Sequence, residues 1–413
     1  MSIIKWFIVV SLFFVIICNC NKKEETDTQT TSTDCNVGSN SKCNLNDEMK
    51  SISGNCSLKL INDMWGIYDK NGTKPNTFYC QCIFNNGNIF GWKWQWPHDG
   101  GLALLGIKSY PEILFGRNPY NNNASTTSLL PIMISNIDQI QVTYTANLNL
   151  LTQTTNQYNL SFDLWVTDSQ TPTSSNIKAE IMIWELANTG FTPPSNIPTY
   201  SNVPIGGQYY DLYEYPHGLD PYWTHSFVSK STPNISNRII NLKPFLDYLI
   251  NKNDFSTDRF LSNVTFGTEL YEGSGTITFT DYAVNISTLQ TNNSDFKITR
   301  CFYTETNNIE QAVVNEFGSN YRIADWNDIV SYCQSNSPDQ FINNLNWQLG
   351  EENSFIVIWN GQHFYNNGTR HFYISRFDHN KPIHYLAHDN IDNHHIDLGS
   401  WYGLNMPILC IKK

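Results

Sequence analysis

The stretch Asn159-Leu-Ser-Phe-Asp-Leu-Trp-Val-Thr-Asp168 alternates between two kinds of side chain along its whole length. One set is apolar and consists of Leu160, Phe162, Leu164 and Val166, and the other consists of Ser161, Asp163, Trp165 and Thr167. Successive side chains of a β-strand point to opposite faces of a sheet. The stretch therefore predicts a strand with one face in a core and a second face that carries an acid beside a tryptophan.

Two further segments show the same alternation. In 179–186, Ile181 and Ile183 form the apolar face, and the opposite face carries Glu180, Met182 and Trp184. In 263–270, Val264 and Phe266 face one side, and Thr265, Gly267 and Glu269 face the other. Each of the three predicted strands thus presents one carboxylate away from the core, beside Trp, Met or Thr. Solvated faces more often carry Lys, Thr and Ser, so this combination indicates a lined cleft.

Three carboxylates on such faces favour one kind of chemistry. Hydrolysis of a sugar bond with retention uses one carboxyl as nucleophile and a second as acid and base. A third acid beside the nucleophile can share a proton with it and alter the titration of both. A single acid on a strand would more often be a plain exposed residue.

Strand signals dominate from about residue 55 to 290, where Asn, Gly, Pro and Thr clusters separate short β-branched or aromatic runs. The exception is 242–249, in which Leu242, Phe245, Leu246 and Leu249 share a helical face. The pattern predicts an all-β sandwich or barrel.

The composition excludes several classes of protein. With 25 Lys+Arg against 37 Asp+Glu the net charge is -12, and there is no basic run to contact nucleic-acid phosphates. A hydrophobic content of 40% with 12 Trp and 22 Tyr argues against intrinsic disorder.

The N-terminus predicts export. Lys5 precedes an apolar run, 6–18, that is shorter than the roughly 20 residues of a membrane span and matches a secretory signal. We expect a signal peptide at 1–20, a polar linker at 21–50 and no integral membrane segment. Two interpretations of Cys20 stay open: it is the lipid-bearing first residue of a lipoprotein, or the signal is simply cleaved nearby.

Eight cysteines follow the signal, at positions 35, 43, 56, 80, 82, 301, 333 and 410. An even number in an exported chain predicts disulfides. Five precede residue 83 and three follow residue 300, so either one pair links the two regions or one thiol in each stays free. Cys80 and Cys82 have no second pair at zinc spacing, and we expect no metal and no cofactor.

Aromatic residues supply candidate sugar contacts. Trp92, Trp94 and Trp96 share one face, where they form either a binding platform or part of a sandwich core. Trp65 follows polar residues and precedes Gly66, which predicts an exposed indole.

Six segments together, in this order, resemble glycoside hydrolase family 12. They are Asn62-Asp-Met-Trp-Gly66, Phe90-Gly-Trp-Lys-Trp-Gln-Trp-Pro97, Lys108-Ser-Tyr-Pro-Glu-Ile-Leu-Phe-Gly116, Phe162-Asp-Leu-Trp165, Glu180-Ile-Met-Ile-Trp184 and Phe266-Gly-Thr-Glu269. Each segment is weak evidence alone, and the shared order over about 55–290 carries the resemblance.

The resemblance implies a β-jelly roll of two packed sheets with an open cleft on the concave one, at 51–296. It implies retaining hydrolysis of internal β-1,4 bonds in a glucan, with Glu180 as nucleophile, Glu269 as acid/base and Asp163 as the acid bonded to the nucleophile. Asn62, Trp65, Met182 and Trp184 match substrate-binding positions. The expected partner is a β-glucan polysaccharide and the expected state is a monomer.

Two departures from the family pattern stand out. Asp63 replaces the second of two adjacent Asn residues, which puts the substrate preference in doubt. Glu185 replaces an apolar residue and falls on the core side of its strand, so we expect it at a strand end within reach of water.

The region 297–413 is predicted to be a smaller α+β accessory domain. Seven of the ten His lie here, and loop signatures at 320–329, 388–393 and 398–403 give it a C-type-lectin-like look. His388, Asp389, Asp392, His394 and His395 include metal-ligating types, but their spacing fits no defined loop, and a solvated polar loop is favoured.

The leading hypothesis is a secreted or surface-tethered endo-β-1,4-glucanase acting on cellulose-like or xyloglucan chains. The alternative is a non-catalytic glycan-binding surface protein, disfavoured because binding alone does not require Glu180, Glu269 and Asp163 in motif. A third hypothesis, an adhesion lipoprotein led by the C-terminal domain, is compatible with activity.

Overall fold

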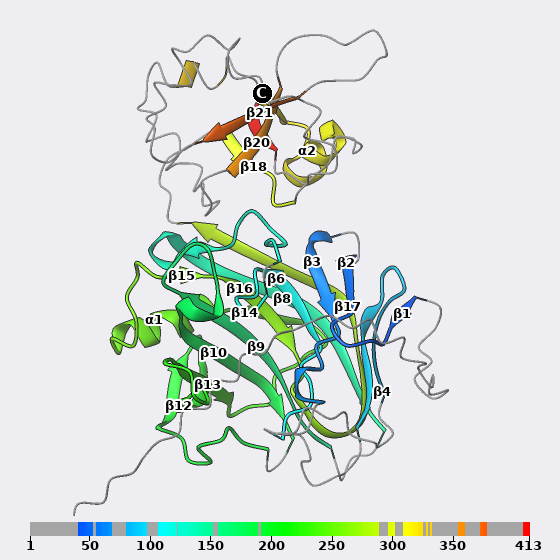
Figure 1. Ribbon diagram of the computed structural model, residues 1–413, viewed down its shortest axis with the longest axis vertical. Coiled ribbons are helices and arrows are strands. Elements are labelled where there is room, and N and C mark those ends of the chain that lie inside the picture. The colour runs from blue at the N-terminus through cyan, green and yellow to red at the C-terminus, as the bar shows by residue number, and fades with distance from the viewer. Residues whose placement is uncertain are drawn as a thin grey trace, which may run out of the picture. The chain divides into compact units, whose positions relative to one another are not determined.

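The structure is a computed structural model. It describes residues 40–52, 55–67, 80–96, 106–121, 123–151, 156–188, 191–288, 296–301, 309–324, 328, 331–332, 354–359, 372–377 and 408–413. Strands dominate the described residues between 40 and 288, as the alternation predicts (Figure 1).

One sheet, here called the back sheet, contains six strands. In spatial order they are β1 (Ser41–Lys42), β4 (Cys80–Asn85), β5 (Phe90–Trp96), β17 (Leu270–Thr288), β8 (Ile137–Leu150) and β14 (Arg238–Asn241). All of their pairings are antiparallel.

The second sheet, here called the front sheet, carries Asp163 on β9 and Glu180 on β10, two of the three predicted acids. Its spatial order is β2 (Glu48–Ile52), β3 (Asn55–Ile61), β6 (Glu112–Gly116), β16 (Asn263–Gly267), β9 (Gln157–Thr167), β10 (Ile177–Ala187), β13 (Trp223–Ser229), β12 (Gln208–Pro216) and β11 (Tyr200–Ile205). The β10–β13 pair is parallel, and the other pairs named here are antiparallel. Short strands β7 (Ile132–Met133) and β15 (Phe260–Leu261) extend the sheet beside β9.

The core lies between the two sheets. Leu160, Phe162, Leu164 and Val166 of β9 are at most 1% exposed and belong to one buried cluster, which confirms the predicted apolar face. Aromatic rings join the layers: the ring of Phe266 on β16 lies 4.7 Å from that of Tyr144 on β8. Such aromatic contacts add specific packing to the large area that they bury. The two-sheet sandwich is therefore as predicted.

Two sequence predictions about the core are resolved by burial. Trp92, Trp94 and Trp96 are at most 3% exposed, so they are core residues and not a binding platform. The predicted helix is α1 (Lys243–Asn251), with Phe245, Leu246 and Leu249 buried.

The prediction that Glu185 reaches water is wrong. Glu185 is 1% exposed, and it interrupts the β9–β10 register at a bulge between Trp184 and Leu186. Its carboxylate accepts hydrogen bonds from Arg238 Nε (2.5 Å) and Nη2 (3.0 Å) and from the Tyr144 hydroxyl (3.0 Å). A buried carboxylate needs such partners, and β14 supplies the cation that the sequence did not reveal.

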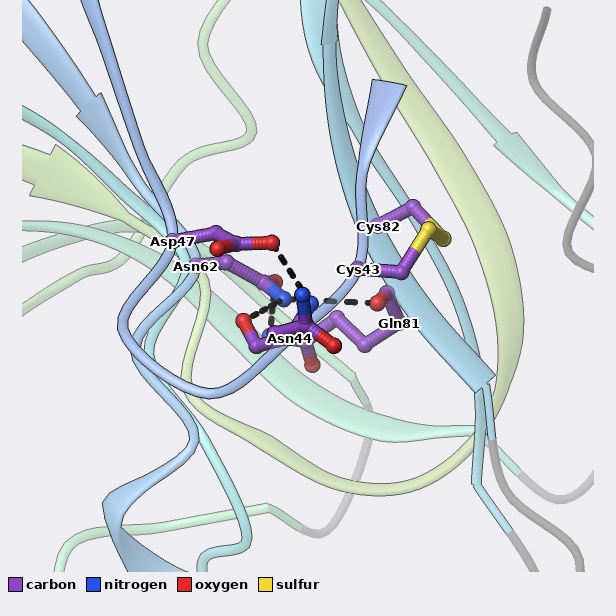
Figure 2. Close-up of a disulfide and its surroundings, with 6 residues drawn as sticks. All are labelled: Cys43, Asn44, Asp47, Asn62, Gln81 and Cys82. Atoms are coloured by element: carbon purple, nitrogen blue, oxygen red, sulfur yellow. Dashed lines mark hydrogen bonds between the residues drawn. A yellow bond between two sulfur atoms is a disulfide. The ribbon is translucent and has the colours of Figure 1, made fainter. Parts of the chain in front are cut away.

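Among the described residues, four of the cysteines that follow the signal form disulfides, and one is free. Cys43 is bonded to Cys82 (Figure 2). Cys80 and Cys301 are also disulfide-bonded, to partners outside the part of the chain whose side chains are described. Cys410 is a buried free thiol, which favours the expected alternative of unpaired thiols.

The C-terminal region contributes β18 (Phe296–Ile298), α2 (Ile309–Phe317), β19 (Tyr321–Ile323), β20 (Ser354–Trp359), β21 (Phe372–Phe377) and β22 (Leu409–Lys412). β22 pairs with β18 and β19, and β20 pairs with β21. The lectin-like character and the domain boundary remain predictions. Cys20, the signal segment and the cluster from His388 to His395 lie outside the described residues.

No helix among the described residues has the length and apolar character to span a membrane.

Candidate active site

Neighbouring strands of the front sheet bring two of the predicted acids together. Asp163 on β9 lies opposite Met182 on β10 and opposite Thr265 on β16. Glu180 lies two residues before Met182, opposite Trp165. Because these side chains share the face away from the core, alternation in three separate segments converges on one site.

Glu269 reaches the site from just beyond a strand end. β16 ends at Gly267, so Glu269 lies in the connection to β17 and not within the strand that the sequence predicted. Asn159 holds it in place: the Asn159 amide donates to Glu269 Oε2, and the Glu269 backbone N–H donates to Asn159 Oδ1 (3.2 Å).

Two polar groups contact the Glu180 carboxyl. Its Oε2 accepts a hydrogen bond from the Thr224 hydroxyl at 2.5 Å and lies 2.8 Å from His217 Nδ1. Thr224 is the register partner of Glu180 across the parallel β10–β13 pair. Both contacts therefore hold the side chain through the same oxygen.

Burial governs the protonation of the Glu269 carboxyl. Burial, and next the charge of Glu180, raise its pKa from 4.5 to about 8, against the lowering effects of the Asn159 hydrogen bond and of His217. The Glu269 carboxyl is therefore mostly protonated at neutral pH. Two carboxyls whose environments separate their protonation states can act as an acid and a nucleophile.

Asp163 is placed to remain protonated. Burial raises its pKa well above the usual range, and the charges of Glu180, Glu112 and Glu269 raise it further. Its Oδ1 has no hydrogen-bond partner among the described residues. A protonated Asp163 is a hydrogen-bond donor in the middle of the acidic group, whereas an ionised one would repel its neighbours.

Glu112 is a fourth acid, which the sequence analysis did not single out. It lies on β6 opposite Gly267 and is 3% exposed. Burial raises its pKa well above the usual range, followed by the charge of Asp63. Burial likewise raises the pKa of Asp63 to about 6, so the departure from the family pattern adds another proton-binding group at this end of the sheet.

The side chains of Trp65, Met182 and Trp184, which are predicted to bind substrate, differ in their exposed fractions. Trp65, in a short turn at Trp65–Ile67, is 44% exposed, as predicted. Trp184 and Met182 are 2% and 4% exposed, and their substrate-binding roles stay predictions. The ring of Phe191 stacks on that of Trp184 with centroids 5.5 Å apart, and this stacking covers the indole.

The substrate-binding role of Asn62 stays a prediction. The residue is completely buried, and its amide donates to the Asn44 carbonyl oxygen (2.9 Å) and accepts from Gln81 Nε2 (3.0 Å) (Figure 2). The Cys43–Cys82 disulfide lies beside this network. Asn62 therefore positions the segment that leads to Trp65.

One cluster among the described residues has metal-ligating types, namely Glu214, His225 and Asp254. The Lys252 ammonium contacts both carboxylates, at 3.1 Å from Asp254 Oδ2. The cluster thus already contains a positive charge.

Sequence reasoning missed His217, Thr224 and Asn159 as parts of the site. Asn159 opens the alternating stretch but resembles any polar strand residue. His217 lies 37 positions beyond Glu180, in the turn after β12, and no local pattern relates the two. Among the site residues that the sequence analysis did not single out, only Glu112 lies in one of the six motif segments, and its place there could have identified it.

Known proteins resemble more than half of this chain in sequence and in fold. The chain is 28% identical over 246 residues to Endoglucanase S of Pectobacterium parmentieri, with 58% of this chain and 86% of the relative covered. It is 28% identical over 232 residues to the xyloglucan-specific endo-beta-1,4-glucanase A of Emericella nidulans, covering 55% and 85%. A solved family 12 xyloglucanase from Bacillus licheniformis is 23% identical with a TM-score of 0.50, over 60% of this chain and all of that one, which supports the fold.

The family model described as Glycosyl hydrolase family 12 matches residues 56–287, which contain most strands of the sandwich and the acids Asp63, Glu112, Asp163, Glu180 and Glu269. The chain belongs to glycosyl hydrolase family 12 and is a glycoside hydrolase.

Proposed function

We propose that this protein is an exported, retaining endo-β-1,4-glucanase that cleaves cellulose-like or xyloglucan chains by double displacement. The observation that carries the proposal is the contrast between two carboxyls. Glu180 receives hydrogen bonds suited to an anion, and the pKa of Glu269 is raised to about 8. A nucleophile and a general acid need these two protonation states.

In the first step Glu180 attacks the anomeric carbon, and the glycosidic C–O bond breaks. The electron pair of that bond goes to the leaving oxygen, which takes the proton of Glu269. In the second step Glu269 removes a proton from water, the water oxygen attacks the anomeric carbon, and the bond to Glu180 breaks. Asp163, whose pKa is raised, adds no further negative charge beside them while it is protonated.

The substrate class rests on the relatives and on the exposed Trp65. Two relatives carry names that specify endoglucanase or xyloglucan-specific endo-beta-1,4-glucanase activity. An exposed indole offers an apolar face to the C–H surface of a glucose ring. Export is supported by the signal-like run after Lys5.

The test is release of reducing ends from xyloglucan, carboxymethylcellulose and mixed-linkage glucan. Wild type should be active on at least one of them, and Glu180→Gln should lose activity by several orders of magnitude because the amide is no nucleophile. Asp281→Asn, which changes an exposed carboxylate on the back sheet, is the matched control and should remain active.

The stereochemistry is read separately by proton NMR of the first product, which should keep the β-anomer. Inversion would contradict the assignment of Glu180 as nucleophile. Binding of any of the three glucans without cleavage would instead support the non-catalytic alternative.

A further inference from the structure

His217 contacts the proposed nucleophile Glu180, and it lies outside the six motif segments that carry the family resemblance. It lies in the turn between β12 and β13, and its Nδ1 is 2.8 Å from Glu180 Oε2. Its Nε2 points the other way and lies 4.0 Å from Asp220 Oδ2. The imidazole therefore lies between two carboxylates.

The surrounding packing fixes the imidazole ring. It stacks on Tyr222, with ring centroids 4.7 Å apart and planes at 27°, and meets the edge of Trp165 at 5.9 Å. The His217 backbone N–H donates to the Tyr222 carbonyl oxygen (3.1 Å), and the Asp220 N–H donates to that of His217 (2.9 Å). Because backbone and aromatic contacts hold the imidazole ring in one orientation, the ring can in turn fix the orientation of the Glu180 carboxylate.

Charge around the ring favours the imidazolium. Burial lowers the pKa of His217, but the hydrogen bond and charge of Glu180, with Asp220 and Glu269, raise it above its ordinary value overall. Tyr222 and Trp165, the two rings in contact with it, carry no charge at neutral pH.

Both polar contacts of Glu180 involve the same oxygen. His217 Nδ1 and the Thr224 hydroxyl meet at Oε2, and no hydrogen bond from a described residue engages Oε1. A carboxylate held at one oxygen presents the other in a fixed direction.

We propose that His217 is a positioning residue that holds Glu180 through Oε2, so that Oε1 forms the bond to the sugar, and that it stabilises the carboxylate released in the second step. This inference rests on the proposed role of Glu180 as nucleophile.

The two chemical steps use the His217 hydrogen bond differently. In the first step Oε1 bonds to the anomeric carbon and the Glu180 carboxylate loses its charge. In the second step water bonds to that carbon, the C–Oε1 bond breaks, and its electron pair returns to Glu180 while Glu269 accepts the water proton. Negative charge then reappears next to Nδ1–H, and a preorganised donor is most valuable where charge develops. Loss of His217 should therefore slow the second step more than the first.

The test is steady-state and stopped-flow kinetics with 2,4-dinitrophenyl β-cellobioside, whose leaving group needs no proton from Glu269. His217→Phe keeps a ring for Tyr222 and Trp165 and removes the donor. For this variant kcat should fall about ten- to a hundredfold, as expected for loss of a hydrogen bond to a charged group. KM should fall in parallel, kcat/KM should change by less than about threefold, and a burst close to one dinitrophenolate per enzyme should appear.

His217→Asn is the rescue variant, because its side-chain amide offers a neutral donor near the position of Nδ1. It should recover most of kcat and lose the burst. Circular dichroism and melting check folding first, and His217→Ala replaces His217→Phe if the latter does not fold.

Wild-type kcat without a burst in a folded His217→Phe protein would overturn the inference. A kcat/KM that falls as far as kcat would overturn it too, because it would indicate a loosened site. Glu180→Gln, measured in parallel, separates the two proposals. If Glu180→Gln keeps full activity, the assignment of Glu180 as nucleophile is wrong. If Glu180→Gln is inactive and His217→Phe has wild-type kinetics, only the proposed role of His217 is wrong.

Discussion

Replacing Glu269 with Gln should make the protein more stable at alkaline pH. The buried Glu269 carboxyl has a pKa raised from 4.5 to about 8, so the folded state keeps a proton that the unfolded state releases. The free energy of unfolding then falls as pH rises from about 4.5 through 8, because the unfolded state binds fewer protons in this range. Glutamine has the same shape, keeps an oxygen for the Asn159 amide, and has no proton to lose.

The size of the effect follows from the shift. At about 1.4 kcal/mol for each pKa unit, the Glu269 carboxyl should cost wild type about 3 to 4 kcal/mol of stability between pH 5 and pH 8. Glu112, whose pKa burial also raises, titrates in both proteins and cancels in the comparison, whereas Asp163 loses the raising effect of the Glu269 charge in the variant. Glu269→Gln should therefore be about as stable as wild type near pH 5 and clearly more stable at pH 8.

The measurement is guanidinium unfolding of both full-length proteins at pH 5 and pH 8, followed by tryptophan fluorescence, with Asp281→Asn as the exposed control. The quantity of interest is the difference between variant and wild type at each pH, which removes effects common to both. The same difference at the two pH values would refute the raised pKa of Glu269 and, with it, the assignment of this residue as the acid.

Three other predictions follow from the same geometry. Because Glu269 must donate a proton, kcat/KM on a polysaccharide should fall as pH rises through about 8; a profile flat from about pH 7 to 9.5 would contradict this. Arg238→Met would leave Glu185 buried without its cation and should cost about 3 to 5 kcal/mol of unfolding free energy by denaturant titration, with near-normal specific activity of the folded protein. Gly267→Ala would place a methyl group 2.7 Å from the Tyr110 ring and should lower the melting temperature and kcat together, whereas an unchanged melting temperature would show that the ring yields freely.

Much of the fold was predictable because strand alternation is a local property. The apolar face of β9, the helix α1 and the placement of Asp163 and Glu180 on one face follow from spacing alone. The faces of single strands do not reveal which strands become neighbours, so the meeting of these acids was expected mainly from the order of the motifs.

Burial was the quantity that the sequence predicted least well. Trp92 and Trp65 both lie in motif segments, yet the first is in the core and the second is 44% exposed. Trp184 shares a face with Glu180 but lies beneath Phe191, and Asn62 is enclosed by Gln81 and Asn44. Exposure depends on what other segments place over a residue, and local patterning carries no information about that.

The sequence by itself determined the class of fold, because strand alternation depends on residue type and period-two spacing, and the order of the motifs selected Asp163, Glu180 and Glu269 as candidate acids. The tertiary structure decided the surroundings of these acids: burial and the charge of Glu180 raise the pKa of Glu269, and His217 and Thr224 reach Glu180 from a distant turn and a parallel strand. Desolvation and charge interactions depend on distances through space, and those distances exist only once the sheets have packed.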